Sequence, residues 1–166
     1  RPRYFASPGL KELYSAIEEA KADVTGLFML QHLYDRKLIP AGPDRERQLY
    51  TTFLASTFRT LRFGLNDAHG KGMAMQVNYL TDQGGFVAHA DGTFAVNFDK
   101  IRAAVRDLDH ELLTVEATGD YARAKQMLDQ LGVIRPNMQK ALSGLEGIPV
   151  DIQPVFVTAN EIAPER

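Results

Sequence analysis

Residues 9–27 read GLKELYSAIEEAKADVTGL, and apolar side chains recur in this stretch at intervals of three and four residues. This spacing places them on one face of an α-helix, which the helix can bury against its neighbours. Ser7 and Pro8 suit the start of such a helix. The apolar positions are Leu10, Leu13, Ile17, Ala20, Val24 and Leu27. The sequence therefore predicts one amphipathic helix that begins near Pro8 and continues past Leu27.

The opposite face of this helix carries acids and small residues. It contains Glu12, Ala16, Glu19, Asp23 and Gly26, and no Lys or Arg lies on that line. Acids four residues apart repel by a few tenths of a kcal/mol unless water or a cation screens them. Gly26 inside a helix costs about 1 kcal/mol relative to Ala, which suggests close packing there. Two interpretations remain open: a solvated face, or a face that meets another helix and a metal ion.

The composition limits the classes of protein and partner. The 166 residues, 45% apolar and 24% charged, fit one globular domain (1–166) or a large piece of one. A net charge of −2 without a basic block argues against nucleic acid or an anionic membrane surface as a partner. No apolar run approaches the roughly 20 residues that span a bilayer. The absence of cysteine favours a cytoplasmic location and leaves His, Asp and Glu as metal ligands.

The rest of the chain is mostly helical by pattern. Asp44 can cap a helix that ends near Gly64, and a glycine-rich break follows it. An Asp-Gly turn between two short apolar runs, 86–89 and 93–96, predicts a β-hairpin. Further helices are expected at 73–82, 99–115, 121–131 and 136–145. The predicted fold is mainly α: a multi-helix body with one small hairpin and an extended tail at 150–157, VDIQPVFV.

Two candidate motifs fail on spacing. DHELL at 109–113 resembles the start of a zinc-peptidase His-Glu-x-x-His, but the residue four beyond His110 is Thr114. A phosphate-binding loop would need four residues between its glycines and a hydroxyl after the lysine. Gly64 has five residues before Gly70, and Lys71 is followed by another glycine. Neither a two-histidine zinc helix nor a nucleotide-binding loop is therefore expected.

The histidines differ in their surroundings. His69 stands beside a glycine at a helix start, where the backbone can approach a ligand closely, and imidazole titrates near neutral pH. The alternative for His69 is a solvent-exposed capping turn. His32 and His89 have no inferable partners and are expected to be structural or surface residues. His69 is therefore the candidate active-site histidine.

Four segments, in order, carry a resemblance to a known family. EEAKAD at 18–23 resembles the Glu-Glu-x-x-Ala-Asp/Glu signature of the dipeptidyl-peptidase III family of zinc metallopeptidases. Residues 49–72 end in AHGKG, where that family has an active-site Ala-His. DGTFAVNFDKIR at 91–102 and EATGDYARAKQMLDQLGV at 116–133 continue the resemblance, which spans about 10–156. The HGKG form is similar to the bacterial and plant branch, in which such regions are sometimes joined to a Nudix domain.

The resemblance implies roles for the acids. Glu19 matches the third zinc ligand of the family. Glu18 and Asp23 match groups around the ligands, which orient the ligating histidines; loss of such groups commonly costs about 10- to 100-fold in metal affinity or activity. The expected cofactor of the intact parent is therefore Zn²⁺.

The resemblance also implies a role for His69, and it contains one departure. His69 would face the active site and contact substrate or stabilise charge at the scissile carbonyl. The family usually has Arg four residues further on, where this chain has Met73. Lys71 is the candidate that supplies this charge instead. The substrate expected for the parent is a peptide.

The His-Glu-x-x-Gly-His helix of the family, with two zinc ligands and the catalytic Glu, should lie upstream of residue 18, and the given sequence starts at Arg1 without it. The chain is therefore expected to be a C-terminal fragment of the helical catalytic region of a larger metallopeptidase-like protein. Its partner would be the missing N-terminal part of that protein. Alone it should be inactive and bind zinc weakly or not at all, because a catalytic zinc needs about three protein ligands.

Two other interpretations stay open. The first is a catalytically silent helical binding or regulatory module associated with a Nudix hydrolase. The second is a helical domain whose acidic face is merely solvated.

Overall fold

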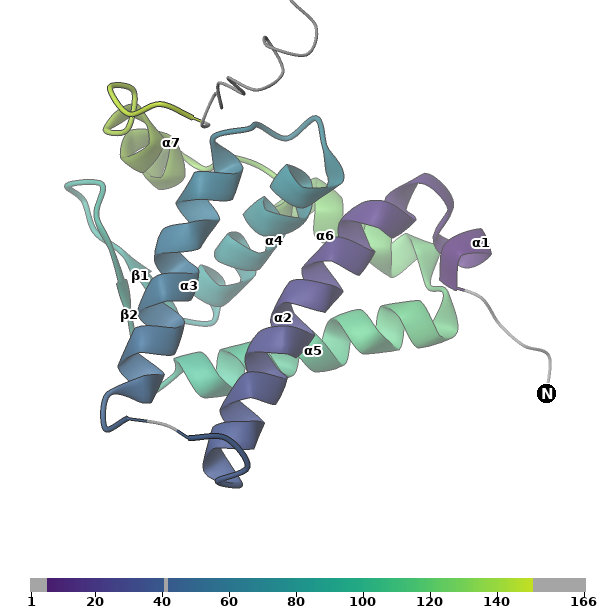
Figure 1. The fold of residues 1–166 in the computed structure, drawn as a ribbon. Helices are drawn as coiled ribbons and strands as arrows, with labels where there is room; N and C mark the ends of the chain where they lie inside the picture. Colours follow the sequence, from purple (N-terminus) through teal and green to yellow (C-terminus); the bar gives the residue numbers. More distant parts are fainter. Residues whose placement is uncertain (1–5, 41, 151–166) are drawn as a thin grey trace, which may run out of the picture.

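A computed structural model describes residues 6–40 and 42–150 of the chain. These residues form seven α-helices, a short 3-10 helix and a two-stranded antiparallel sheet (Figure 1). The helices are α1 (Ala6–Leu10), η1 (Lys11–Leu13, the 3-10 helix), α2 (Tyr14–Asp35), α3 (Arg45–Leu61), α4 (Ala68–Asp82), α5 (Ile101–Thr118), α6 (Tyr121–Leu131) and α7 (Pro136–Ser143). The strands are β1 (Phe86–Ala88) and β2 (Phe94–Val96). The predicted mainly α fold with one hairpin is confirmed.

α4 is the central helix of the structure. It contacts α2, α3, α5 and α6, and Figure 1 shows it among these helices. Its buried residues lie all around the helix: Gly70, Gly72, Met73, Ala74, Met75, Gln76, Val77, Asn78 and Leu80. A helix that is buried on every side fixes the positions of the helices packed on it.

Two glycines allow the first turns of α4 to pack closely against neighbouring backbone. A Cβ atom on Gly72 would lie 2.7 Å from the Ala16 carbonyl oxygen of α2, and a Cβ on Gly70 would lie 1.8 Å from the Gly64 carbonyl oxygen. Gly64 itself has φ +87°, in the left-handed region that favours glycine. The Asp67 carboxylate caps the helix by accepting a hydrogen bond from the Gly70 amide at 2.9 Å. The close approach of α4 to α2 therefore requires a residue without a side chain.

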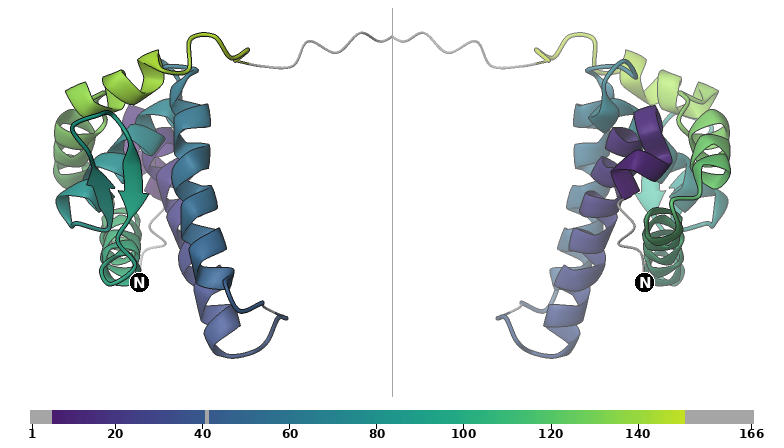
Figure 2. Two further views of the ribbon diagram at one scale, coloured as in Figure 1. Left: turned by 90° about the vertical axis from the view of Figure 1, so that its left-hand side faces the viewer. Right: turned by 90° about the vertical axis from the view of Figure 1, so that its right-hand side faces the viewer.

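The hairpin and α7 pack on the side of α3 that faces away from α2 (Figures 1 and 2). The strands pair in antiparallel register, with Phe86 opposite Val96. Among the described residues, no helix is both long enough and apolar enough to cross a bilayer. The tail expected at 150–157 falls beyond residue 150, outside the described part of the chain.

Three local predictions were wrong. The first helix does not run unbroken from Pro8, because Lys11 has φ +53° and η1 separates α1 from α2. This break turns α1 onto α5 and α6 and buries Leu10 completely. The break predicted before Met73 is instead the first turn of α4. Nothing lies within 4 Å of a Cβ placed on Gly26, so no described element packs there.

The two helical glycines Gly72 and Gly26 provide a matched test of the packing between α2 and α4. We expect Gly72→Ala to lower the free energy of unfolding by about 1–3 kcal/mol, because its methyl group would overlap backbone of α2. Gly26→Ala should raise it by up to about 1 kcal/mol, since the site is open and Ala favours the helix. Urea denaturation of both variants measures the two effects. Equal effects of the same sign would contradict the packing described.

Candidate functional site

The first turn of α4 places His69 against the acidic face of α2. The His69 Nδ1 atom lies 3.1 Å from the Glu19 Oε2 atom. Gly72, three residues after His69, packs closely against Ala16 and Ala20 of α2. The Glu19 side chain is 37% exposed and the His69 side chain 65% exposed. Because so exposed a contact contributes little to stability, both side chains are available to a ligand.

A second contact between the same helices lies one turn further along α2. The Asp23 Oδ2 atom accepts a hydrogen bond from the Gln76 Nε2 atom at 3.1 Å. Gln76 is completely buried, whereas Asp23 is exposed. Glu19 and Asp23 are four residues apart on α2, and His69 and Gln76 are seven apart on α4, so each pair shares one helix face. The two contacts together form one polar seam.

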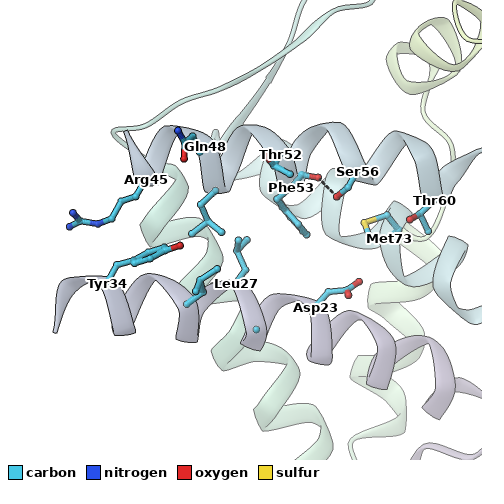
Figure 3. Close-up of a pocket in the computed structure, with 13 residues that line it drawn as sticks. Asp23, Leu27, Tyr34, Arg45, Gln48, Thr52, Phe53, Ser56, Thr60 and Met73 are labelled. Carbon is cyan, nitrogen blue, oxygen red and sulfur yellow. Dashed lines mark hydrogen bonds between the residues drawn. The ribbon is translucent and has the colours of Figure 1, made fainter. Parts of the chain in front are cut away.

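A cleft of about 560 Å³ begins at Asp23 and runs between α2 and α3 (Figure 3). Asp23 and Met73 lie toward one end of it, and Tyr34 and Arg45 lie at the other. Gly26 forms part of the wall of the cleft, and no atom of another described element lies within 4 Å of the place where its side chain would begin. The other lining residues are Leu27, Leu30, Gln48, Leu49, Thr52, Phe53, Ser56 and Thr60. The cleft is thus lined by apolar and uncharged polar side chains along its length, with an acid at one end and a base at the other.

Glu18 makes its contacts on the side of α5. Lys21 donates a hydrogen bond to Glu18 at 2.7 Å and lies 3.6 Å from Glu116 of α5. The bond from Lys21 lowers the pKa of Glu18. Burial, together with the neighbouring Glu18 carboxylate, raises the pKa of Glu116 to about 7. This cluster ties α2 to α5, and whether Glu18 also orients a metal ligand stays a prediction.

Lys71 lies on another side of α4 from His69. Side chains two positions apart in a helix point in directions that differ by about 200°. The aliphatic stem of Lys71 lies beside Gly132, at the end of α6, where a Cβ on Gly132 would be 3.1 Å from the Lys71 Cγ atom. Met73 is buried at the cleft. The structure therefore does not place the Lys71 stem beside the Glu19–His69 pair, and its role in substrate binding stays a prediction.

The described residues do not make a complete metal centre. Across 6–40 and 42–150, no group of three or more His, Cys, Asp or Glu side chains is placed to hold a metal ion. His32, His89 and His110 are exposed. Glu19 and His69 do offer a carboxylate oxygen and an imidazole nitrogen, which are donor types that zinc binds. The donors present therefore fit zinc in kind, but a complete set requires others.

Gln76 and Glu116 were not predicted from the sequence. Gln76 stands seven residues after His69, and this two-turn spacing would have revealed a shared face had the helix been predicted to begin at Ala68. Glu116 gave no signal, because only the packing of α5 on α2 brings it to Glu18 and Lys21.

Comparison with solved structures assigns the fold. The chain superposes on dipeptidyl-peptidase III from Caldithrix abyssi with a TM-score of 0.88 and 41% sequence identity, over 95% of this chain and 30% of that one. It superposes on dipeptidyl-peptidase III from Corallococcus sp. strain EGB with the same TM-score and 46% identity, over 95% of this chain and 29% of that one. The chain has the fold of a segment of dipeptidyl-peptidase III.

A curated plant protein is also similar. The chain is 44% identical over 155 residues to Nudix hydrolase 3 of Arabidopsis thaliana, a match that covers 92% of this chain and 20% of that protein. No protein-family model matches the chain. The chain thus spans about a fifth of this relative and less than a third of each dipeptidyl-peptidase III chain.

Glu116 gives a prediction for stability against pH. Because its pKa is raised in the folded state, folding favours the protonated form, and this stabilisation is lost as the pH rises from about 4.5 through about 7. The pKa of Glu18 is lowered, so that carboxyl stays ionised throughout this range. Glu116→Gln cannot ionise. We therefore expect the free energy of unfolding of the Glu116→Gln variant, minus that of the wild type, to be higher at about pH 8 than at about pH 5.

Urea denaturation at both pH values measures this difference. Tyr14 and Lys21 also face the Glu18 carboxylate, and both are present in the two proteins compared. A difference between Glu116→Gln and the wild type that stays constant with pH would show that Glu116 ionises normally in the folded protein.

Proposed function

We propose that the chain is part of a zinc-dependent peptidase of the dipeptidyl-peptidase III type, in which Glu19 is a zinc ligand and His69 serves the same active site. The observation that carries the proposal is the contact at 3.1 Å between these side chains, in a fold shared with dipeptidyl-peptidase III at 41–46% identity. The chain would form the C-terminal part of the helical catalytic region of a longer protein.

Each side chain of the seam has a defined task in this proposal. The Glu19 carboxylate holds the metal ion through an oxygen. Asp23, one turn away, accepts a hydrogen bond from a ligating histidine and so orients its ring. His69, exposed beside Glu19, donates a hydrogen bond to the carbonyl of a bound peptide and stabilises the charge that develops there. When bound, zinc supplies Lewis acidity and lowers the pKa of its water toward 7.

The remaining metal donors come from outside this chain. Glu19 is one ligand, and a catalytic zinc needs about three from the protein. The cleft between α2 and α3 opens beside Asp23, and Gly26 leaves its wall free of side chains. A segment from the N-terminal part of the same protein, carrying the other ligands, fits this position. The 166-residue chain by itself is accordingly expected to be inactive and to bind zinc weakly.

A second function is favoured by a separate observation. The similarity to Nudix hydrolase 3 covers 92% of this chain. The chain could therefore serve as a catalytically silent helical module beside a Nudix domain. In that case the full-length protein would hold no zinc at Glu19, and replacing Glu19 or His69 would leave its chemistry unchanged.

The test uses the full-length protein, with bound zinc measured by chelator competition and turnover measured on a panel of short peptides. We expect Glu19→Ala to lower zinc affinity by more than about tenfold, because a direct ligand should matter at least as much as its supporting groups. We expect His69→Ala to keep zinc and to lower kcat by about 100-fold, the usual cost of losing a donor to a developing oxyanion.

Two variants are matched controls. Glu12→Gln changes an exposed carboxylate that precedes α2 and accepts a hydrogen bond from the Tyr121 hydroxyl. His110→Ala changes an exposed histidine of α5. Both should keep wild-type zinc affinity and kcat. A full-length protein that binds no zinc tightly, or whose zinc affinity is the same with Glu19→Ala, would defeat the peptidase proposal and support the silent module.

A further inference from the structure

Gln76 of α4 is a buried polar side chain that donates a hydrogen bond to Asp23. It is 0% exposed, and its Nε2 atom donates to the Asp23 Oδ2 atom at 3.1 Å. Its Oε1 atom is buried and has no hydrogen-bond partner among the described residues. Reversing the amide would direct this oxygen at a carboxylate, so the hydrogen bond to Asp23 fixes the amide in the orientation observed.

A glutamine in this position has an energetic cost. A buried polar atom without a partner costs about 1–3 kcal/mol, and an unbranched apolar residue of similar size, such as Met, would avoid that cost. Met73 and Leu80, which lie three and four residues from Gln76 and share its side of α4, are apolar and buried. Packing alone therefore gives no reason for an amide at this position, which leaves its bond to Asp23 as the distinguishing interaction.

We propose that Gln76 is a positioning residue for the zinc site and acts through Asp23; this inference rests on the proposed function. By holding Oδ2 from the rigid central helix, Gln76 fixes the carboxylate of an exposed side chain that otherwise rotates freely. The Oδ1 atom accepts no hydrogen bond from the described residues, and Asp23 lines the cleft. Oδ1 is thus free to accept the N–H of a ligating histidine that enters from the cleft.

The substitution that tests this role is Gln76→Met in the full-length protein, because Met keeps the size of the side chain and removes the donor. Zinc affinity is measured by chelator competition, and the coordination geometry by the visible spectrum of the cobalt-substituted protein. We expect zinc affinity to fall by about tenfold and the cobalt spectrum to change, while the melting temperature falls little or not at all. Both readouts are independent of turnover.

Gln31 supplies a matched control. It is also buried, at 6% exposure, donates from Nε2 to an aspartate (Asp35, 2.9 Å), and has an Oε1 atom without a partner among the described residues. Asp35 lies at the far end of α2 from Glu19. Gln31→Met should therefore keep zinc affinity and the cobalt spectrum, whatever its effect on stability.

A double-mutant cycle with Asp23→Ala shows whether Gln76 acts through Asp23. We expect Asp23→Ala to lower zinc affinity and Gln76→Met to add nothing to it in the double variant. The inference would be overturned if Gln76→Met kept the zinc affinity of the wild type. It would also be overturned if the effects of the two substitutions on zinc affinity were simply additive. In both cases the proposed zinc site would remain valid. A full-length wild type without tight zinc binding would instead overturn the proposed function, and this inference with it.

Discussion

The close packing of α4 on α2 is the constraint on which the rest of the structure depends. At Gly72 the two backbones approach so closely that a single methyl group would lie 2.7 Å from a carbonyl oxygen of α2. One turn earlier on α4, this approach brings His69 to Glu19. One turn later, it brings Gln76 under Asp23. A short stretch of small residues thus sets the positions of four polar side chains.

The seam combines rigid and exposed partners. The buried glutamine belongs to a helix enclosed on all sides, whereas the acids stand on the open edge of α2. The cleft beside them is lined by both apolar and uncharged polar side chains, and Arg45 at its far end has a buried Nε atom without a partner in the described part of the chain. These features support the proposal that a further segment of a longer protein completes the cleft.

Much of the fold could be predicted from residue patterns, and the errors have physical causes. Asp-Gly between apolar runs specified the hairpin, and α6 lies where its periodicity predicts it, from Tyr121 to Leu131. Gly70 and Gly72 were taken as helix breakers on local propensity. Their tertiary role prevailed, because a buried helix crossing gains more from close contact than glycine loses in propensity. The break at Lys11 likewise depends on packing that buries Leu10.

The candidate site likewise contains residues that local sequence patterns indicate and residues that only the packing of helices brings together. Glu19 and His69 were predicted as site residues from local motifs, and the structure places their side chains 3.1 Å apart. Gln76 could have been found only with the correct start of α4, and Glu116 only with the docking of α5. Lys71 was chosen to replace a charge absent at Met73, but the direction in which a helical residue points depends on helix phase rather than on closeness in sequence.

A crystal structure of the full-length protein with zinc, using anomalous scattering at the zinc absorption edge, tests the central claim most directly. We expect an anomalous peak about 2.0–2.2 Å from an oxygen of Glu19, with His69 facing the same space and the other ligands supplied from outside this chain. A peak bound elsewhere, with the Glu19 carboxylate turned into bulk solvent away from His69, would contradict it.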